Sequence, residues 1–239
     1  MCGRFSTVLT QSELAEAYSV DLDLVGTWMP AYTVAPRETA PLLHARPAEG
    51  DGDPVRRIEI VTWGFDAAWM RPGQPRPINS RIEKLTTGMW RGALNSSRAV
   101  VPQTSYFEWY EAADGGKQPI LLHSDQPLAA AALYAGKQEA DGSWTHTFTI
   151  VTREARDASG EVHERMPAFI PLDSELFERW ISPEHPASPA ELVDELMAES
   201  ERVAQTITSH PVSRRVNNVR TAKSDDATLI EPIELDESR

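Results

Sequence analysis

Short apolar or alternating runs, separated by turns rich in glycine and proline, limit most strongly what this chain can fold into. Residues 57–65 read as a strand, and residues 128–134 and 144–152 form a hairpin around Asp141-Gly142. Asp114-Gly115-Gly116 marks a second turn, leading into a strand at 119–123. Alternation with tight turns of this kind is typical of antiparallel sheets.

Further elements can be placed by their boundary signals. Strands are also expected at 32–36, 41–45, 99–101, 106–110 and 203–209. Thr10 and Glu13 form a capping box for a helix over 11–19. Asp173 is expected to cap a helix that ends near Ile181, and Ser188-Pro189 begins another. Hairpins with helices placed around them predict an α+β domain with an antiparallel, barrel-like sheet and peripheral helices.

The 239 residues are 41% hydrophobic and 25% charged, which is ordinary for a globular protein, and we expect one domain over 1–230 with an acidic tail over 231–239. The longest apolar stretch, 127–135, is too short to span a bilayer, and no secretory leader follows Met1. We therefore expect no membrane partner and a cytoplasmic location. A single cysteine allows no internal disulfide.

Net charge argues against general affinity for nucleic acid, because a formal charge of −13 repels phosphate. Charge is nevertheless uneven. Six basic residues and one acid, Glu83, lie between Arg71 and Arg98, and four basic residues without an acid lie between His210 and Ser224. These runs are either solvated faces or a contact surface for an anionic partner.

Cys2 is chemically unusual because removal of Met1 would leave one residue with both an α-amine and a thiol. Their reference pKa values are about 7.7–8.0 and about 8.5, so part of the amine is nucleophilic near neutral pH. An aldehyde would condense with the amine to an imine, and the tethered thiol would then close a five-membered thiazolidine. The alternative is that Cys2 is merely a small residue at a disordered end.

Five motifs distributed along the chain give Cys2 more weight. In order they are Met1-Cys2-Gly3-Arg4-Phe5, Ile78-Asn79-Ser80-Arg81, Phe107-Glu108-Trp109, His163-Glu164-Arg165-Met166-Pro167 and His210-Pro211-Val212-Ser213. Together they span residues 1 to about 218, and the chain closely resembles the SRAP family, the SOS response-associated peptidases.

That resemblance implies a β-rich SRAP-type single domain with a basic channel for single-stranded DNA and Cys2 at its floor. It also implies an autopeptidase that removes its own Met1, captures abasic sites as a thiazolidine DNA–protein crosslink, and reverses the crosslink slowly as part of the DNA damage response. Single-stranded DNA containing abasic sites is then the partner, at the nucleoid, with no cofactor and no obligate protein partner.

The resemblance also implies roles for individual residues. Cys2 is the nucleophile, and Asn79 would orient its amine without protonating it. Glu108 lies between two aromatic residues, so partial desolvation should raise its pKa toward the working range and suit it to shuttle protons. A surface glutamate is the competing interpretation, since on a strand Glu108 points away from both aromatics. His163 would give a proton to the opening sugar or the leaving hydroxyl.

DNA contacts are expected at five positions. Arg4, Arg81 and Arg165 match family positions for phosphates, where the guanidinium fork suits pairs of oxygens. Trp69 could stack on a base at the lesion, and His210 is placed at the margin of the site. Binding through such contacts should be modest and sensitive to salt.

Three departures from the family pattern concern DNA binding. Met70 stands where a second tryptophan is usual, Thr33 replaces an asparagine before Val34-Ala35-Pro36, and 88–90 lacks an expected arginine.

Two other functions remain open. The chain could be a cysteine peptidase or amidohydrolase acting in trans, with Cys2 as nucleophile and His163 or Glu108 as base. It could also be a non-covalent module for single-stranded DNA. Zinc-ligand spacing, phosphate loops and dinucleotide fingerprints are absent from the sequence, so no metal or other cofactor is implied.

Overall fold

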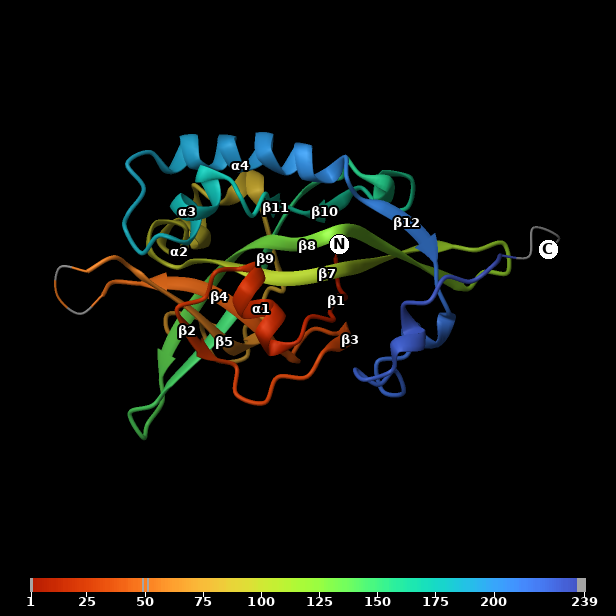
Figure 1. Ribbon diagram of the computed structural model, residues 1–239, viewed down its shortest axis with the longest axis horizontal. Helices are drawn as coiled ribbons and strands as arrows, with labels where there is room; N and C mark the ends of the chain where they lie inside the picture. Colours follow the sequence, from red (N-terminus) through yellow and green to blue (C-terminus); the bar gives the residue numbers. More distant parts are fainter. Residues whose placement is uncertain (1, 49, 51, 236–239) are drawn as a thin grey trace.

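Two long strands organise the molecule, β7 (Arg98–Glu111) and β8 (Lys117–Gln138). They pair antiparallel from Arg98↔Leu133 to Glu111↔Lys117, with one irregularity between Gln103 and Ser105. Figure 1 shows this pair crossing the centre of the computed structural model, which describes residues 2–48, 50 and 52–235. Apolar residues dominate both strands, so each strand can be covered on both faces.

Five strands close into a ring through successive pairings. β8 pairs with β9 (Trp144–Glu154), β9 with β5 (Val55–Trp63), β5 with β4 (Thr39–Arg46), and β4 with β7, which returns to β8. The three loop-linked pairs, β4–β5, β7–β8 and β8–β9, are antiparallel hairpins, whereas β5 and β9 lie parallel. The ring gives every one of these strands two neighbours.

Alternate side chains of the ring strands enter two different apolar clusters. Ala99 and Val101 belong to one cluster with Cys2, whereas Val100 between them belongs to the other cluster, which includes residues of the helices. Because side chains alternate across a strand, the two clusters lie on opposite faces of the ring strands. The cluster with nearly all of the buried helix residues lies on the outer face, and the other, the interior cluster, lies on the inner face and also includes Ala204. Cys2 is thus part of the interior cluster.

Shorter strands extend this sheet to twelve strands in the described part of the chain. They are β1 (Phe5–Thr7), β2 (Leu22–Leu24), β3 (Ala31–Val34), β6 (Asn79–Arg81), β10 (Arg165–Pro167), β11 (Phe169–Ile170) and β12 (Thr208–Pro211). β1 pairs with both β7 and β3, while β6 and β10 both pair with β9. The motifs on β1, β6 and β10 are therefore fixed to the ring by backbone hydrogen bonds.

Helices cover the outside of the ring, with α4 lying along its length in Figure 1. Their bounds are α1 (Gln11–Ala17), α2 (Arg91–Ser96), α3 (Glu175–Ile181) and α4 (Pro189–Ala204), and short 3-10 turns include η1 (Ile82–Lys84), η3 (Ala158–Glu161) and η4 (Arg214–Asn217). The capping box of Thr10 and Glu13 is present at α1, and Ser188 caps α4 with Pro189 in its first turn.

The α+β class with peripheral helices is confirmed. Besides the antiparallel pairs, the sheet contains three parallel ones, β2–β5, β5–β9 and β6–β9. The strands expected at 99–101 and 106–110 are one strand, β7, and those at 119–123 and 128–134 both belong to β8. The polar positions within β7 and β8 do not interrupt the backbone hydrogen bonds of these strands, because each strand of the closed ring pairs with a neighbour on both sides.

Several predicted boundaries differ from those observed, and the structure gives a physical reason for two of them. The helix expected to be capped by Asp173 is capped by Ser174, whose hydroxyl accepts the Phe177 amide hydrogen. The last strand begins at Thr208 rather than at 203, because α4 continues to Ala204. Leu196, Ser200 and Ala204 are buried at intervals of four residues, so one helical face stays covered to the end.

The segment after β12 returns to the body of the protein. Val212 forms a bridge with Pro232, and the Ile233 amide donates to the Pro211 carbonyl oxygen at 2.9 Å. The proposed division at residue 230 stays a prediction, and 236–239 lie outside the described residues.

Within the described residues, none of the helices combines the length and apolar character needed to cross a bilayer.

Candidate active site at the amino terminus

Cys2 is fully buried in the interior cluster, beside strand β7. Its thiol donates to the Arg4 carbonyl oxygen at 3.6 Å, and the same oxygen accepts the Phe107 amide hydrogen at 2.9 Å. Burial, followed by the nearby Glu108 carboxylate, raises the pKa of the Cys2 thiol far above its usual range. The thiol is therefore neutral and ordered, and the interpretation of Cys2 as a residue of a disordered end is wrong.

Asn79 contacts Cys2 directly. Its side-chain amide donates to the Cys2 carbonyl oxygen at 2.9 Å. The preceding Ile78 carbonyl accepts both the Trp63 indole N–H at 2.8 Å and the Ile150 amide at 3.0 Å. The proline-rich loop over 72–77 thus delivers Asn79 to a position held by two strands of the ring.

Glu108 is buried (2% exposed) although its neighbours Phe107 and Trp109 point the other way. Those two rings stack on the opposite face of β7, with centroids 6.3 Å apart. Both faces of the strand are covered, so the surface-glutamate interpretation is wrong. Burial raises the pKa of Glu108 to about 7, and the negative charge of Asp157 acts in the same direction. The direction of the shift agrees with the expectation, but Phe107 and Trp109 are not its cause, because both lie on the opposite face of β7. A pKa near 7 leaves comparable acid and base forms near neutrality.

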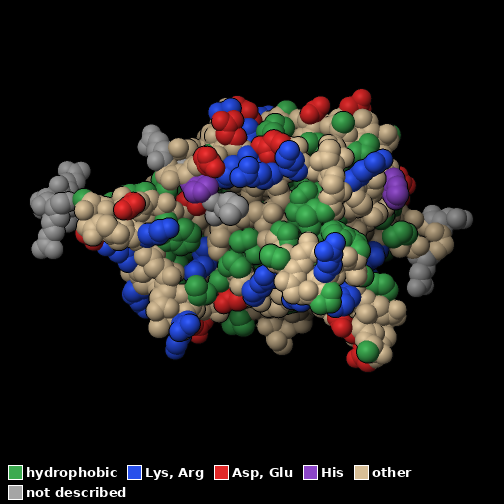
Figure 2. Space-filling model, turned by 180° about the vertical axis from the view of Figure 1, so that it is seen from behind, with side chains coloured by type: hydrophobic (Ala, Val, Ile, Leu, Met, Phe, Trp, Pro, Cys, Tyr) green, Lys and Arg blue, Asp and Glu red, His purple; other side chains and the backbone are tan. Residues whose placement is uncertain are grey.

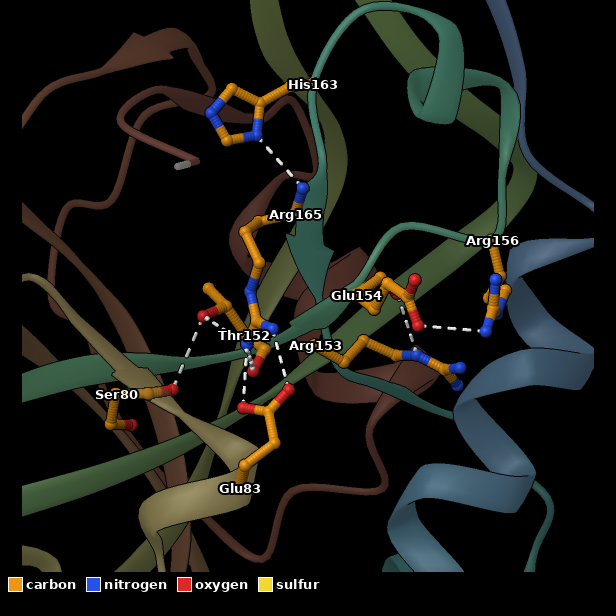
Figure 3. A network of polar contacts seen from close by, with 8 residues as sticks. All are labelled: Ser80, Glu83, Thr152, Arg153, Glu154, Arg156, His163 and Arg165. Carbon is orange, nitrogen blue, oxygen red and sulfur yellow. Dashed lines mark hydrogen bonds and ion pairs between the residues drawn. The ribbon is translucent and has the colours of Figure 1, made fainter.

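His163 lies just before β10 with its ring partly buried, and burial lowers its pKa. The Arg165 backbone N–H donates to His163 Nδ1 at 3.0 Å, as Figure 3 shows. A nitrogen that accepts a hydrogen bond carries no proton, so the neutral ring keeps its proton on Nε2. That nitrogen lies on the side of the ring away from the Arg165 backbone.

A pair that the sequence did not indicate joins these segments. The Tyr106 hydroxyl, on a side chain with no exposed surface, donates to the Asp157 carboxylate. Tyr106 is two residues from Glu108 on β7, and Asp157 is six residues before His163. No sequence motif marks Asp157, since a lone aspartate before a serine-glycine turn is typical of a solvated loop.

Arg4, expected to bind phosphate, is buried with 5% exposure. One terminal nitrogen donates to the Thr33 hydroxyl and to the Val216 carbonyl oxygen, each at 3.0 Å. Thr33, one of the departures noted above, is therefore a partner of Arg4. These contacts place Arg4 between β1, β3 and η4, where it ties the amino-terminal segment to the body.

Arg165 makes a bidentate ion pair with Glu83, with N–O distances of 2.7 and 3.1 Å. It also donates to the Thr152 carbonyl oxygen at 2.6 Å and is 8% exposed. Figure 3 shows this fork closing on the Glu83 carboxylate, below His163. The pair links η1, which follows Asn79 and Arg81, to β10, which follows His163.

The other expected DNA contacts are spread more widely. Arg81 is exposed at the end of β6, opposite Thr152 of β9. Trp69 is 58% exposed, whereas Met70 is turned inward and its sulfur accepts the Ala67 amide hydrogen at 3.4 Å. Their roles in DNA binding stay predictions.

The structure does not bring His210 to Cys2. His210 lies opposite Leu121 of β8, and Leu121 lies opposite Phe107 of β7. Residues paired in this way share one face of the sheet, so His210 faces away from Glu108. Its Nε2 donates to the Ile230 carbonyl oxygen at 3.0 Å.

Basic residues of the two charged runs differ in availability. Figure 2 shows several Lys and Arg side chains across the middle of one face of the molecule. Arg98 of the first run is buried, and Arg76 pairs with Asp66 at 2.6 Å. In the second run Arg214 pairs with Asp114 and Arg215 with Asp226, each at 2.5 Å. Part of the local positive charge is therefore neutralised within the molecule.

No group of three histidine, cysteine or acidic side chains in the described residues is arranged to hold a metal ion. What the site does present is a thiol, an amide, a carboxyl of raised pKa and an imidazole of lowered pKa, drawn from four separate segments. This arrangement defines a class of α+β proteins whose candidate nucleophile is a buried cysteine at position 2 of the chain.

The family follows from comparison with known proteins. Residues 1–219 match the model of the family described as SOS response associated peptidase (SRAP), and the chain belongs to that family. The abasic site processing protein YedK of Escherichia coli (strain K12) is 31% identical over 240 residues, covering 98% of this chain and all of YedK (100%). The abasic site processing protein HMCES of Gallus gallus is 26% identical, covering 88% of this chain and 68% of its own.

Solved structures also resemble this one. A protein from Bacteroides thetaiotaomicron superposes with a TM-score of 0.73 at 18% identity, covering 98% of this chain and 100% of that one. A phage-related protein from Bordetella bronchiseptica gives a TM-score of 0.68 at 25% identity, covering 89% and 95%.

Proposed function

We propose that this chain processes abasic sites in single-stranded DNA by forming a covalent crosslink through Cys2. The observation that carries the proposal is the contact between the Asn79 amide and the Cys2 carbonyl, with the buried Glu108 on the adjoining strand. The printed names of the relatives, abasic site processing proteins, support the same substrate. The chain is then an enzyme-like member of its family that acts once per lesion.

The chemistry begins with loss of Met1, by which hydrolysis of one peptide bond frees the α-amine of Cys2. That amine adds to the aldehyde carbon of the opened abasic sugar, and loss of one water gives an imine. The thiol then adds to the imine carbon, its proton passes to the imine nitrogen, and a thiazolidine ring closes. Hydrolysis of the Met1–Cys2 bond consumes one water, and the crosslinking steps from the free amine onward release one.

Glu108 suits both proton transfers because its pKa lies near 7. Its acid form can donate a proton to the hydroxyl that leaves as water, and its carboxylate can then relay the proton of the Cys2 thiol to the imine nitrogen. His163 supports the first step differently, since its Nε2–H can hydrogen-bond to the sugar oxygen that becomes an alkoxide when the ring opens.

The raised pKa of the Cys2 thiol favours this function over a cysteine peptidase acting in trans. Such peptidases attack with a thiolate, whose pKa is lowered by a neighbouring cation. Here burial and a carboxylate act in the opposite direction. A neutral thiol fits a reaction in which the amine attacks the aldehyde first and the thiol adds only after the imine has formed.

A denaturing gel tests the proposal. Wild-type protein incubated with a single-stranded oligonucleotide carrying one abasic site should give a band of reduced mobility that survives denaturation. Cys2→Ala should give none, because the alanine amine can form only a reversible imine. An intact oligonucleotide is the matched substrate control.

Two results would contradict the proposal in different ways. A wild-type lane without a stable band, at protein concentrations where the oligonucleotide is bound, would leave only non-covalent binding. Repeated cleavage of added peptides by wild-type protein, lost in Cys2→Ala, would instead support a peptidase acting in trans.

A further inference from the structure

Asp157 lies near the candidate site, in a segment whose only sequence motif is the one that begins at His163. It lies in the connection between β9 and β10, immediately before η3. Ala155, Ala158 and Val162 of the same connection pack against the interior cluster that contains Cys2. The connection is therefore held on the ring by apolar contacts and by the carboxylate of Asp157.

The partner of Asp157 is unusually well fixed. Tyr106 has no exposed surface, and its ring packs on Phe169 with centroids 5.8 Å apart. Tyr106 also lies opposite Phe5 of β1, the strand that follows Cys2. A hydroxyl in such surroundings needs an acceptor, and the Asp157 carboxylate supplies it.

The same contact brings a second negative charge toward the site. Tyr106 and Glu108 are two positions apart on β7, so their side chains share one face. The carboxylate of Asp157 opposes the ionisation of Glu108, whereas the positive charge of the amino terminus favours it. Glu108 and Asp157 both oppose ionisation of the Cys2 thiol.

We propose that Asp157, held by the Tyr106 hydroxyl, is a positioning residue of this site that acts through Glu108 and His163. The hydrogen bond fixes the segment leading to His163 against the strand that carries Glu108. The carboxylate keeps Glu108 in its acid form over a wider pH range, so that a proton is available when water leaves. The role of Glu108 as the proton donor rests on the proposed function.

The titration of Glu108 in the resting protein tests the charge effect without DNA. Glutamate carboxyl carbons are labelled with carbon-13, and the Glu108 signal is assigned by its loss in Glu108→Gln. Asp157→Asn removes the opposing charge, so the Glu108 titration should move to lower pH by roughly half a unit to one unit. Asp125→Asn, at an exposed position on β8, is the matched control and should leave it unchanged.

The positional effect is tested with Tyr106→Phe, which keeps the buried ring and removes only the hydroxyl. Crosslink formation should slow about tenfold or more while melting temperature changes little, and Tyr110→Phe on the same strand should match wild type. The crosslinking rate should fall at alkaline pH as Glu108 loses its proton. In Asp157→Asn this fall should begin at lower pH, by the same shift as the Glu108 titration.

An unchanged Glu108 titration in Asp157→Asn would overturn the charge effect, and wild-type crosslinking in Tyr106→Phe would overturn the positional effect. Failure of the proposed function would look different, since wild-type protein would then form no crosslink while the titration in the resting protein could still be measured.

Discussion

Burial affects the protonation of the Cys2 thiol and of the Glu108 carboxyl to different extents. The Cys2 thiol is driven to its neutral form, whereas burial raises the pKa of the Glu108 carboxyl only to about 7. A carboxyl of that pKa is protonated below neutrality and ionised above it, so the site holds one exchangeable proton at working pH. The thiol cannot compete for this role because its proton stays bound throughout that range.

The pH dependence of crosslinking follows from this difference. The amine must be unprotonated and Glu108 protonated, so the wild-type rate should rise with pH as the amine deprotonates and fall as Glu108 ionises, giving a bell. Glu108→Gln cannot donate the proton, so its rate should drop by about 100-fold and lose the alkaline limb. Single-turnover rates between pH 5 and 9 check this; an alkaline limb that persists in Glu108→Gln would exclude Glu108 as its source.

Sequence patterns predicted individual residues of the site better than their partners. Burial of Glu108 was expected from the sequence, although the two aromatic residues beside it lie on the other face of β7. The partners of Arg4 and Arg165 were not predicted, because Thr33, Val216 and Glu83 are distant in sequence and their contacts exist only after the ring has closed. Asp157 was missed for the same reason.

At the scale of elements, one buried arginine joins two helices to the ring. Arg98, the first residue of β7, donates to the Leu94 and Asn95 carbonyls at 2.7 and 2.8 Å and to the Trp180 carbonyl at 2.9 Å. It also reaches the carbonyls of Ser182 and Glu184 at 2.6 and 2.7 Å. The last carbonyls of α2 and α3, which have no partners within their helices, are thereby satisfied by one guanidinium.

Replacing this arginine should therefore destabilise the fold. Arg98→Met keeps much of the side-chain volume but leaves several buried carbonyls without donors, which should cost about 3–5 kcal/mol of unfolding free energy. Urea unfolding measures this, with exposed Arg91→Met on α2 as the matched control. A loss below about 1 kcal/mol, the scale of an ordinary surface change, would contradict the capping role.

Element types were predicted more reliably than their ends and pairings. The capping signals of α1 and α4 are local, so the sequence contained them in full. The parallel pairings of β9 with β5 and β6 join segments far apart in the chain, and hairpin signals carry no information about them. β7 and β8 each continue through positions that looked like breaks, because neighbours on both sides supply hydrogen bonds.

At the scale of the whole molecule, fewer basic side chains are free of ion pairs than the two basic runs in the sequence indicated. The chain carries a formal charge of −13, and ion pairs with acids occupy Arg76, Arg214 and Arg215. The proposed phosphate contacts would therefore depend on basic residues that remain exposed, such as Arg81. General repulsion elsewhere would confine phosphate contacts to that region.

The central claim is that the amino-terminal residue itself becomes bonded to the abasic sugar. Intact mass spectrometry of the protein after incubation with an abasic oligonucleotide measures this directly. We predict a conjugate whose mass equals the protein without Met1 plus the oligonucleotide minus one water, and no such species in Cys2→Ala. A protein that retains Met1, or a conjugate that persists in Cys2→Ala, would contradict the claim.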